Sequence, residues 1–223
     1  MASFSEPDIV SGYAARTEQL VPGLRHLHKM TGLLLAERAP ADARVLVLGA
    51  GGGMELKALA ELQPEWRFDG IDPSAEMLQL AETNLGSLAS RVTFQEGYID
   101  KAPEGPFDAA TCLLTLHFLP RGERLQTLRG IQRRLKPGAP FVAAHHSFPT
   151  QGAEPDKWLT RFAAFASLSG VLAFQSENNI RTMKERLPVL SPEEDEALLR
   201  EAGFSNIELF YAGLTFKGWV AYK

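Results

Sequence analysis

The sequence predicts an α/β fold in which helices flank a mostly parallel sheet. Apolar runs of strand length alternate with segments whose apolar residues recur at helical spacing, from about residue 44 onward. The first run enters the glycine-rich turn Gly49–Gly53, and the second ends at a single acid, Asp72. Alternating strands and helices are typical of parallel sheets, whose ligands bind at the carboxyl ends of the strands. We therefore expect a ligand site at that edge.

The turn and Asp72 belong to a predicted βαβ unit. A strand over Val45–Leu48 leads into the turn, and a helix over Met54–Leu62 leaves it. A second strand over Trp66–Ile71 stops at Asp72, where Pro73 suits the first turn of the next helix. Glycines let the backbone approach a ligand, and the helix N-terminus offers free N–H groups. Because a carboxylate at this position can accept two hydrogen bonds from a ribose diol, the unit indicates a nucleoside-containing cofactor.

The glycine spacing narrows the class of cofactor. A dinucleotide fingerprint would place its third glycine at position 54, where the chain has Met54. The chain has Gly49-x-Gly51-x-Gly53 instead, which disfavours a nicotinamide dehydrogenase. A tight turn without a ligand is the alternative, and Asp72 argues against it.

Composition bounds the class of protein. The 223 residues fit one domain, 1–223, with an N-terminal helical cap over 1–40 and a helical insertion or lid over 148–190. The net charge of −4 supplies no global basic field, so a nucleic-acid partner is not expected. No apolar run approaches the roughly 20 residues that span a bilayer, so we expect no membrane partner and a cytoplasmic enzyme. Cys112 lies in an apolar run and is interpreted as a core residue.

The segment before the first strand is predicted to be helical. Leucines recur at helical spacing over Phe4–Ala39, and Pro22-Gly23 interrupts the pattern. The segment is interpreted either as a cap over the cofactor cleft or as a plain core-covering helix. Tyr13 is the one early residue whose hydroxyl could reach a ligand.

Histidines follow the fourth and fifth predicted strands. His117 comes after the buried run Ala109–Leu116, and His145 and His146 come after Ala139–Ala144. Because these ends share one edge of the sheet, Leu113 to His117 should face the cofactor or the acceptor. Imidazole has an unperturbed pKa of about 6.5, so His117, His145 or His146 could act as a general base. Packed or capping histidines are the alternative. A metal site is not expected, because no third residue of a metal-binding type lies at a suitable spacing nearby.

The remaining segments complete the expected fold. The helix Arg121–Leu135 carries a basic face, which we interpret as solvated, with RNA contact as a minor alternative. The aromatic helix Trp158–Phe174 could roof the active site, or it could form the interface of a homodimer. Ser191–Glu194 is a capping box that starts a helix, and two strands, Asn206–Tyr211 and Thr215–Tyr222, end the chain.

Several motifs carry a family resemblance. In order they are VLVLGAGGG, GIDPSAEML, QEGYID, FDAATCLLTLHFL, LKPG and AGF. Together they resemble the motif set of class I S-adenosylmethionine (SAM) dependent methyltransferases over Arg44–Lys223. The resemblance implies a Rossmann-like fold with a seven-stranded sheet and SAM as cofactor. The residues assigned to the cofactor are Gly49, Ala50, Gly51, Gly53, Asp72, Pro73, Tyr98, Ile99 and Leu113, with Glu96 or Asp100 as a further acid near the adenine.

Two segments resemble one branch more narrowly. VPGLRHLHKMTGLLLAE and NNIRTM are similar to carboxy-SAM synthase, which makes carboxy-SAM from SAM and prephenate for tRNA wobble-uridine modification. The resemblance implies that Arg181 pairs with a substrate carboxylate, for which a guanidinium fork is suited. The chain departs from that branch at Val47, Leu24, Tyr98 and Leu113, where the family has polar or acidic residues.

These observations lead to one expected function and two alternatives. We expect a SAM-dependent methyltransferase acting on a small acceptor, which could bear a carboxylate. Catalysis would come mostly from alignment, with His117 or His145 taking a proton and Arg181 orienting an anionic acceptor. The alternatives are a carboxy-SAM synthase-like enzyme and a SAM-binding module without catalysis.

Overall fold

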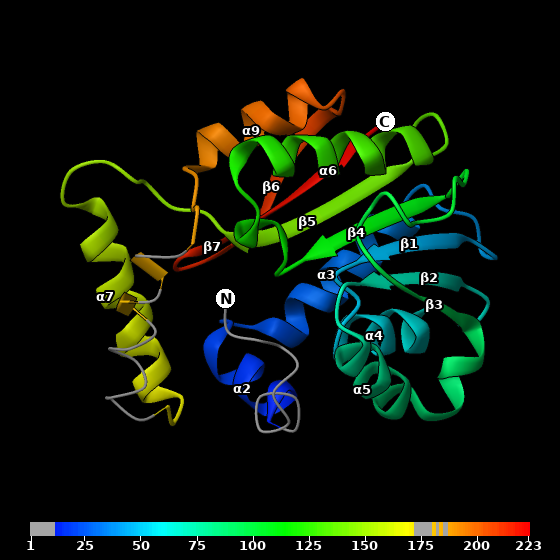
Figure 1. Cartoon of the computed structure of the whole chain (residues 1–223), viewed down its shortest axis with the longest axis horizontal. Helices are drawn as coiled ribbons and strands as arrows, with labels where there is room; N and C mark the ends of the chain where they lie inside the picture. The colour runs from blue at the N-terminus through cyan, green and yellow to red at the C-terminus, as the bar shows by residue number, and fades with distance from the viewer. Residues whose placement is uncertain (1–11, 172–179, 182, 185–186) are drawn as a thin grey trace.

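The computed structural model describes residues 12–171, 180–181, 183–184 and 187–223 (Figure 1). Its centre is a seven-stranded sheet with the order β3-β2-β1-β4-β5-β7-β6. The first five strands are parallel, and β7 runs antiparallel to both β5 and β6. The strands are β1 (Arg44–Leu48), β2 (Arg67–Asp72), β3 (Val92–Glu96), β4 (Ala109–Leu113), β5 (Pro140–His146), β6 (Ser205–Gly213) and β7 (Phe216–Tyr222).

Helices cover both faces of the sheet. One face packs on α3 (Leu24–Ala36), α4 (Met54–Leu62) and α5 (Ala75–Leu85), and the other packs on α6 (Arg121–Arg134) and α9 (Pro192–Glu201). Side chains alternate along each strand, so Val45 and Val47 point to the first core while Leu46 and Leu48 point to the second. These layers confirm the predicted Rossmann-like α/β fold.

Two helices lie beyond the carboxyl edge of the sheet. They are α2 (Tyr13–Leu20) and α7 (Glu154–Leu168), which contact each other. The first confirms a helix ahead of Pro22-Gly23. The second begins before the predicted Trp158, and the end of that prediction, with half of Asn178–Leu187, falls outside the described residues. No helix in the described ranges is both long and apolar enough to cross a bilayer.

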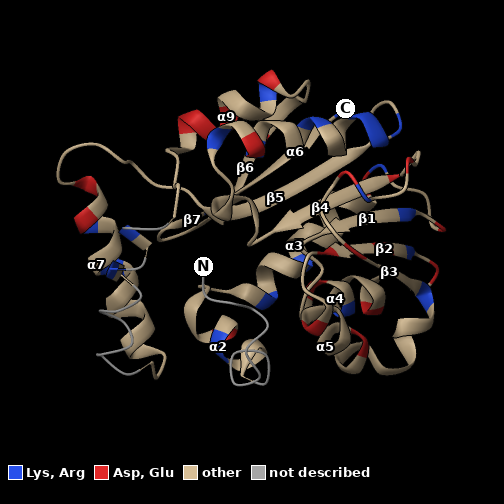
Figure 2. Ribbon diagram, in the orientation of Figure 1, with Lys and Arg blue, Asp and Glu red and all other residues tan. Residues whose placement is uncertain are grey.

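Two local predictions were wrong. The fourth strand ends at Leu113, because Leu114 has a left-handed φ of 57° and a 3-10 turn, η2, follows at Leu116–Phe118. The basic face of α6 is not wholly solvated, since Arg124 and Arg134 are only 1% and 0% exposed. Figure 2 shows both signs of charge over α6, α7 and α9.

Candidate functional site

The glycine turn between β1 and α4 is shaped by close packing. Gly49 has φ 81°, and a Cβ there would collide with the side chain of Thr115. Gly53 has φ 69°, and a Cβ there would lie 2.8 Å from the backbone of Ala81 in α5. Side chains are therefore excluded at both positions. Gly53 packs on α5 and is not among the residues that line the pocket described below.

Asp72 joins the end of β2 to this turn. Its Oδ2 accepts the Gly51 N–H at 2.9 Å, and its Oδ1 accepts the Ser74 N–H at 2.9 Å. Burial raises the pKa of Asp72, and the two N–H groups partly offset that rise. Each carboxylate oxygen has a second lone pair, so the group is oriented and can still accept from a diol. Pro73, the next residue, is exposed.

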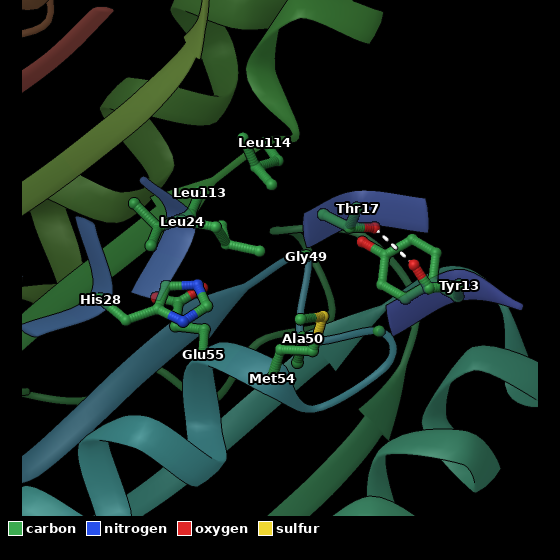
Figure 3. A pocket seen from close by; sticks show the side chains of 11 residues that line it. Tyr13, Thr17, Leu24, His28, Gly49, Ala50, Met54, Glu55, Leu113 and Leu114 are labelled. Carbon is green, nitrogen blue, oxygen red and sulfur yellow. Dashed lines mark hydrogen bonds between the residues drawn. The ribbon is translucent and has the colours of Figure 1, made fainter. Parts of the chain in front are cut away.

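A pocket with about 350 Å³ of empty space opens beside the turn (Figure 3). Residues of α2, α3, α4, the glycine turn and the end of β4 form the wall of the pocket. They are Tyr13, Thr17, Leu24, His28, Gly49, Ala50, Gly51, Met54, Glu55, Leu113 and Leu114.

The structure brings Tyr13 to this pocket. Its ring covers the turn so closely that a Cβ on Gly52 would lie 2.5 Å from ring carbon Cε1. Burial raises the pKa of the phenol, a hydrogen bond with Thr17 lowers it, and the carboxylates of Asp72 and Glu55 raise it further. Of the two interpretations of the N-terminal segment, the cap over the cleft is the one that the position of α2 supports.

Glu55 and His28 were missed by the sequence analysis. Glu55 is 8% exposed, and burial raises its pKa to about 7 despite a lowering contribution from Thr111. His28 is 6% exposed, and burial lowers its pKa to about 4, so its imidazole is neutral at pH 7. An acid in the first turn of a helix ordinarily interacts with the helix dipole at the surface. Only the packing of α3 against α4 shows that this acid is buried.

His117 and His145 do not line the pocket. His117 is 4% exposed, its Nδ1 accepts the backbone N–H of His146 at 3.4 Å, and burial holds its pKa well below the usual value. His145 is 2% exposed, and its Nε2 lies 3.2 Å from Oδ2 of Asp195 without hydrogen-bond geometry. Their general-base role therefore stays a prediction that this geometry does not favour.

Asp195 is the centre of a buried polar cluster on the other face of the sheet. Arg124 donates to its Oδ1 at 2.6 Å and also donates to the Pro188 carbonyl at 2.9 Å. Burial raises the pKa of Asp195, but His145 and Arg124 lower it by more, so the net shift is downward. The cluster joins β5, α6 and α9, which accounts for the burial of Arg124 in α6.

The other predicted site residues lie apart from the pocket or at its edge. Leu113 lines the pocket, as does the next residue, Leu114, whose backbone has a strained left-handed φ. Leu114 is not among the residues that the sequence predicts to bind the cofactor. Tyr98 is 62% exposed, and Ile99 packs on Gly130 of α6. Arg181 is exposed, and the pocket wall does not include it.

Comparisons with known proteins agree with this fold. Residues 45–138 match the family model described as a methyltransferase domain. The carboxy-S-adenosyl-L-methionine synthase of Campylobacter jejuni is 22% identical over 218 residues, which are 98% of this chain and 93% of that protein. A candidate O-methyltransferase structure from Nostoc punctiforme has a TM-score of 0.68 at 22% identity, covering 91% of this chain and 57% of that one.

A human structure extends the likeness. N-acetylserotonin methyltransferase in complex with SAM has a TM-score of 0.60 at 19% identity, covering 98% of this chain and 59% of that one. The chain thus spans a little over half the length of these two solved proteins. The matched segment contains the glycine turn, Asp72, Glu55 and Leu113. Residues 45–138 are thus similar to a methyltransferase domain, and the chain has the fold of these solved methyltransferases.

Proposed function

We propose that the chain is a SAM-dependent methyltransferase that acts on a small acceptor bearing a carboxylate. One observation carries the proposal: Asp72, at the end of β2, accepts the N–H of Gly51, which lines the pocket, within the segment that matches the methyltransferase-domain model. A carboxylate in this place suits a ribose diol, and a glycine turn followed by α4 suits an anionic group.

The residues present fit SAM along the edge of the sheet. Asp72 would hold the ribose, and the free N–H groups at the start of α4 would hold the carboxylate of the amino-acid end. Tyr98 and Ile99, after β3, are the candidates for the adenine. When bound, SAM supplies an electrophilic methyl group on a sulfonium. Leu113, Leu114 and Leu24 would give that part of the pocket an apolar wall.

The chain itself contributes mainly position and exclusion of water. Tyr13 covers the glycine turn from α2, and α7 lies beside α2 beyond the sheet edge. Desolvating and aligning an acceptor are sufficient for much of the rate of a methyl transfer. Arg181 is our candidate for orienting an anionic acceptor, and His117 or His145 for taking a proton.

Carboxy-SAM synthesis is the second candidate. The near full-length likeness to the Campylobacter jejuni protein favours it. Against it, the polar residues of that branch are replaced by Leu24, Tyr98 and Leu113, and Leu24 and Leu113 line the pocket. Mass spectrometry of the cofactor after incubation with SAM and prephenate distinguishes the two, since only a synthase would yield carboxy-SAM.

Calorimetry with SAM tests the proposed cofactor site. We expect micromolar-range binding that Asp72→Ala weakens at least about tenfold, because the ribose loses a charged acceptor. Glu61→Ala, at an exposed position of α4, is the control and should bind as the wild type does. Unchanged binding after Asp72→Ala would remove Asp72 from the site. Binding without methyl transfer to any small carboxylate would support the module without catalysis instead.

A further inference from the structure

Glu55 is a buried acid with unmet bonding capacity at the wall of the pocket. Its side chain is 8% exposed, and its Oε1 has no hydrogen-bond partner within the described part of the chain. The described ion pairs do not include Glu55 either. Burying a carboxylate oxygen without a hydrogen-bond partner is costly, and native structures rarely retain one without a reason. A cation supplied by a ligand would remove that cost.

The position of Glu55 along the sheet indicates which part of a ligand it faces. Thr111 of β4 interacts with Glu55 and lowers its pKa, so the carboxylate lies on the β4 side of β1. Asp72 lies at the end of β2, on the opposite side of β1, and Tyr98 follows β3. A cofactor with its adenine near β3 and its ribose at β2 therefore extends its amino-acid end over β1 toward β4.

Val47 explains why an acid is needed from elsewhere. It occupies the position two residues before Gly49, it is 0% exposed, and it pairs in register with Thr111. Because Thr111 interacts with Glu55, the carboxylate of Glu55 comes to the part of the sheet where β1 itself offers only an apolar side chain. The start of α4 thus supplies the negative charge that the end of β1 lacks.

The other titratable groups of this part of the molecule come from four elements. They are Tyr13 on α2, His28 on α3, Asp72 on β2 and Cys112 on β4. Burial raises the pKa of the phenol and of the thiol, and it lowers the pKa of His28 to about 4, so these three are neutral. His28 therefore does not compete with a cationic ligand for Glu55.

We propose that Glu55 binds the α-ammonium group of the cofactor and so selects ligands that carry an amino-acid end. The inference rests on the proposed SAM-binding function and deepens it.

Two ligands that differ only in the amino-acid end test it. S-adenosylhomocysteine has that end, and 5′-methylthioadenosine lacks it, while both keep the adenosine and the sulfur. We expect Glu55→Gln to weaken S-adenosylhomocysteine at least about tenfold in calorimetry and to change 5′-methylthioadenosine less than about twofold. Glu61→Gln is the matched control on the exposed face of α4 and should change neither affinity.

The outcomes separate the inference from the function on which it rests. If Glu55→Gln weakens both ligands equally, or neither, the ammonium assignment is overturned while SAM binding stands. If the wild type binds neither ligand, both proposals fall.

If Glu55→Gln does not fold, the pH dependence of ligand affinity in the wild-type protein provides a second test. S-adenosylhomocysteine affinity should rise about tenfold from pH 6 to pH 8 as Glu55 ionises, whereas 5′-methylthioadenosine affinity should stay flat. Equal profiles for the two ligands would contradict the assignment.

Discussion

Glu55 and Asp195 are both buried acids in the first turn of a helix, and they lie on opposite faces of the sheet. Asp195 has Arg124 at 2.6 Å and His145 at 3.2 Å, and its pKa is lowered overall. Glu55 has no such cation among the residues that the structure describes, and burial raises its pKa to about 7. A buried acid with its own cation holds elements together, whereas one without a cation is available to a ligand.

Removing Asp195 should have the largest effect on stability. Asp195→Ala leaves Arg124 charged and buried, and breaking such a pair costs about 3–5 kcal/mol of unfolding free energy. Urea denaturation at pH 7 measures it. The control is Glu201→Ala, whose pair with Arg121 is exposed and should contribute less than about 1 kcal/mol. Similar losses in the two variants would contradict the structural role given to the Asp195 cluster.

The pH dependence of that loss follows from the lowered pKa. The stabilisation by Asp195 is present above its unfolded value of 3.8 and is lost as the pH falls through the lower folded value. The difference between wild type and Asp195→Ala should therefore shrink in strong acid.

Glu55 should behave in the opposite way in the ligand-free protein. Its pKa rises on folding from 4.5 to about 7, so its contribution is fully present below pH 4.5 and is lost as the pH rises through 7. At pH 8 the ionised acid should cost up to about 3 kcal/mol, which Glu55→Gln would recover in part. Thermal unfolding from pH 5 to pH 8 checks this, and a wild type and variant with parallel profiles would show that Glu55 has a normal pKa.

Substituting His145 should change stability least, and it distinguishes a supporting role beside Asp195 from a general-base role. If it only supports Asp195, His145→Gln should cost about 1–2 kcal/mol of stability, since Arg124 still pairs with the acid. Urea denaturation measures that cost, and a methyl-transfer assay on the folded variant measures its activity. A loss of about a hundredfold or more in kcat with stability retained would support the general-base hypothesis instead.

The fold and the contact between the glycine turn and Asp72 could be predicted from local patterns. The helix Met54–Leu62 has the predicted bounds, and the Gly49–Gly53 turn and Asp72 meet as the βαβ pattern indicates. These features depend on residues close in sequence, where strand length, helical spacing and turn chemistry act directly. The helix that carries Tyr13 could be predicted in the same way, because Pro22-Gly23 marks where that helix ends.

The buried charges could not be predicted, because distant segments bury them. Glu55 lines the pocket together with residues of α3, and Arg124 forms an ion pair with Asp195, which lies 71 residues later in the chain. The strand β5 is buried throughout, so its apolar run gives no alternation to tell which face His145 takes. Leu114 resembles one more strand residue in the sequence, although its left-handed backbone ends β4.

Proton release on ligand binding would show whether Glu55 ionises when it binds the ammonium group. At pH 6.5 an acid with a pKa of about 7 is mostly protonated, so binding an ammonium group should release up to about 0.8 proton per ligand. Calorimetry of S-adenosylhomocysteine in two buffers of different ionisation enthalpy measures this number. We expect the wild type to release up to about 0.8 proton per ligand and Glu55→Gln to release almost none. Tight binding by the wild type with no proton released would contradict it.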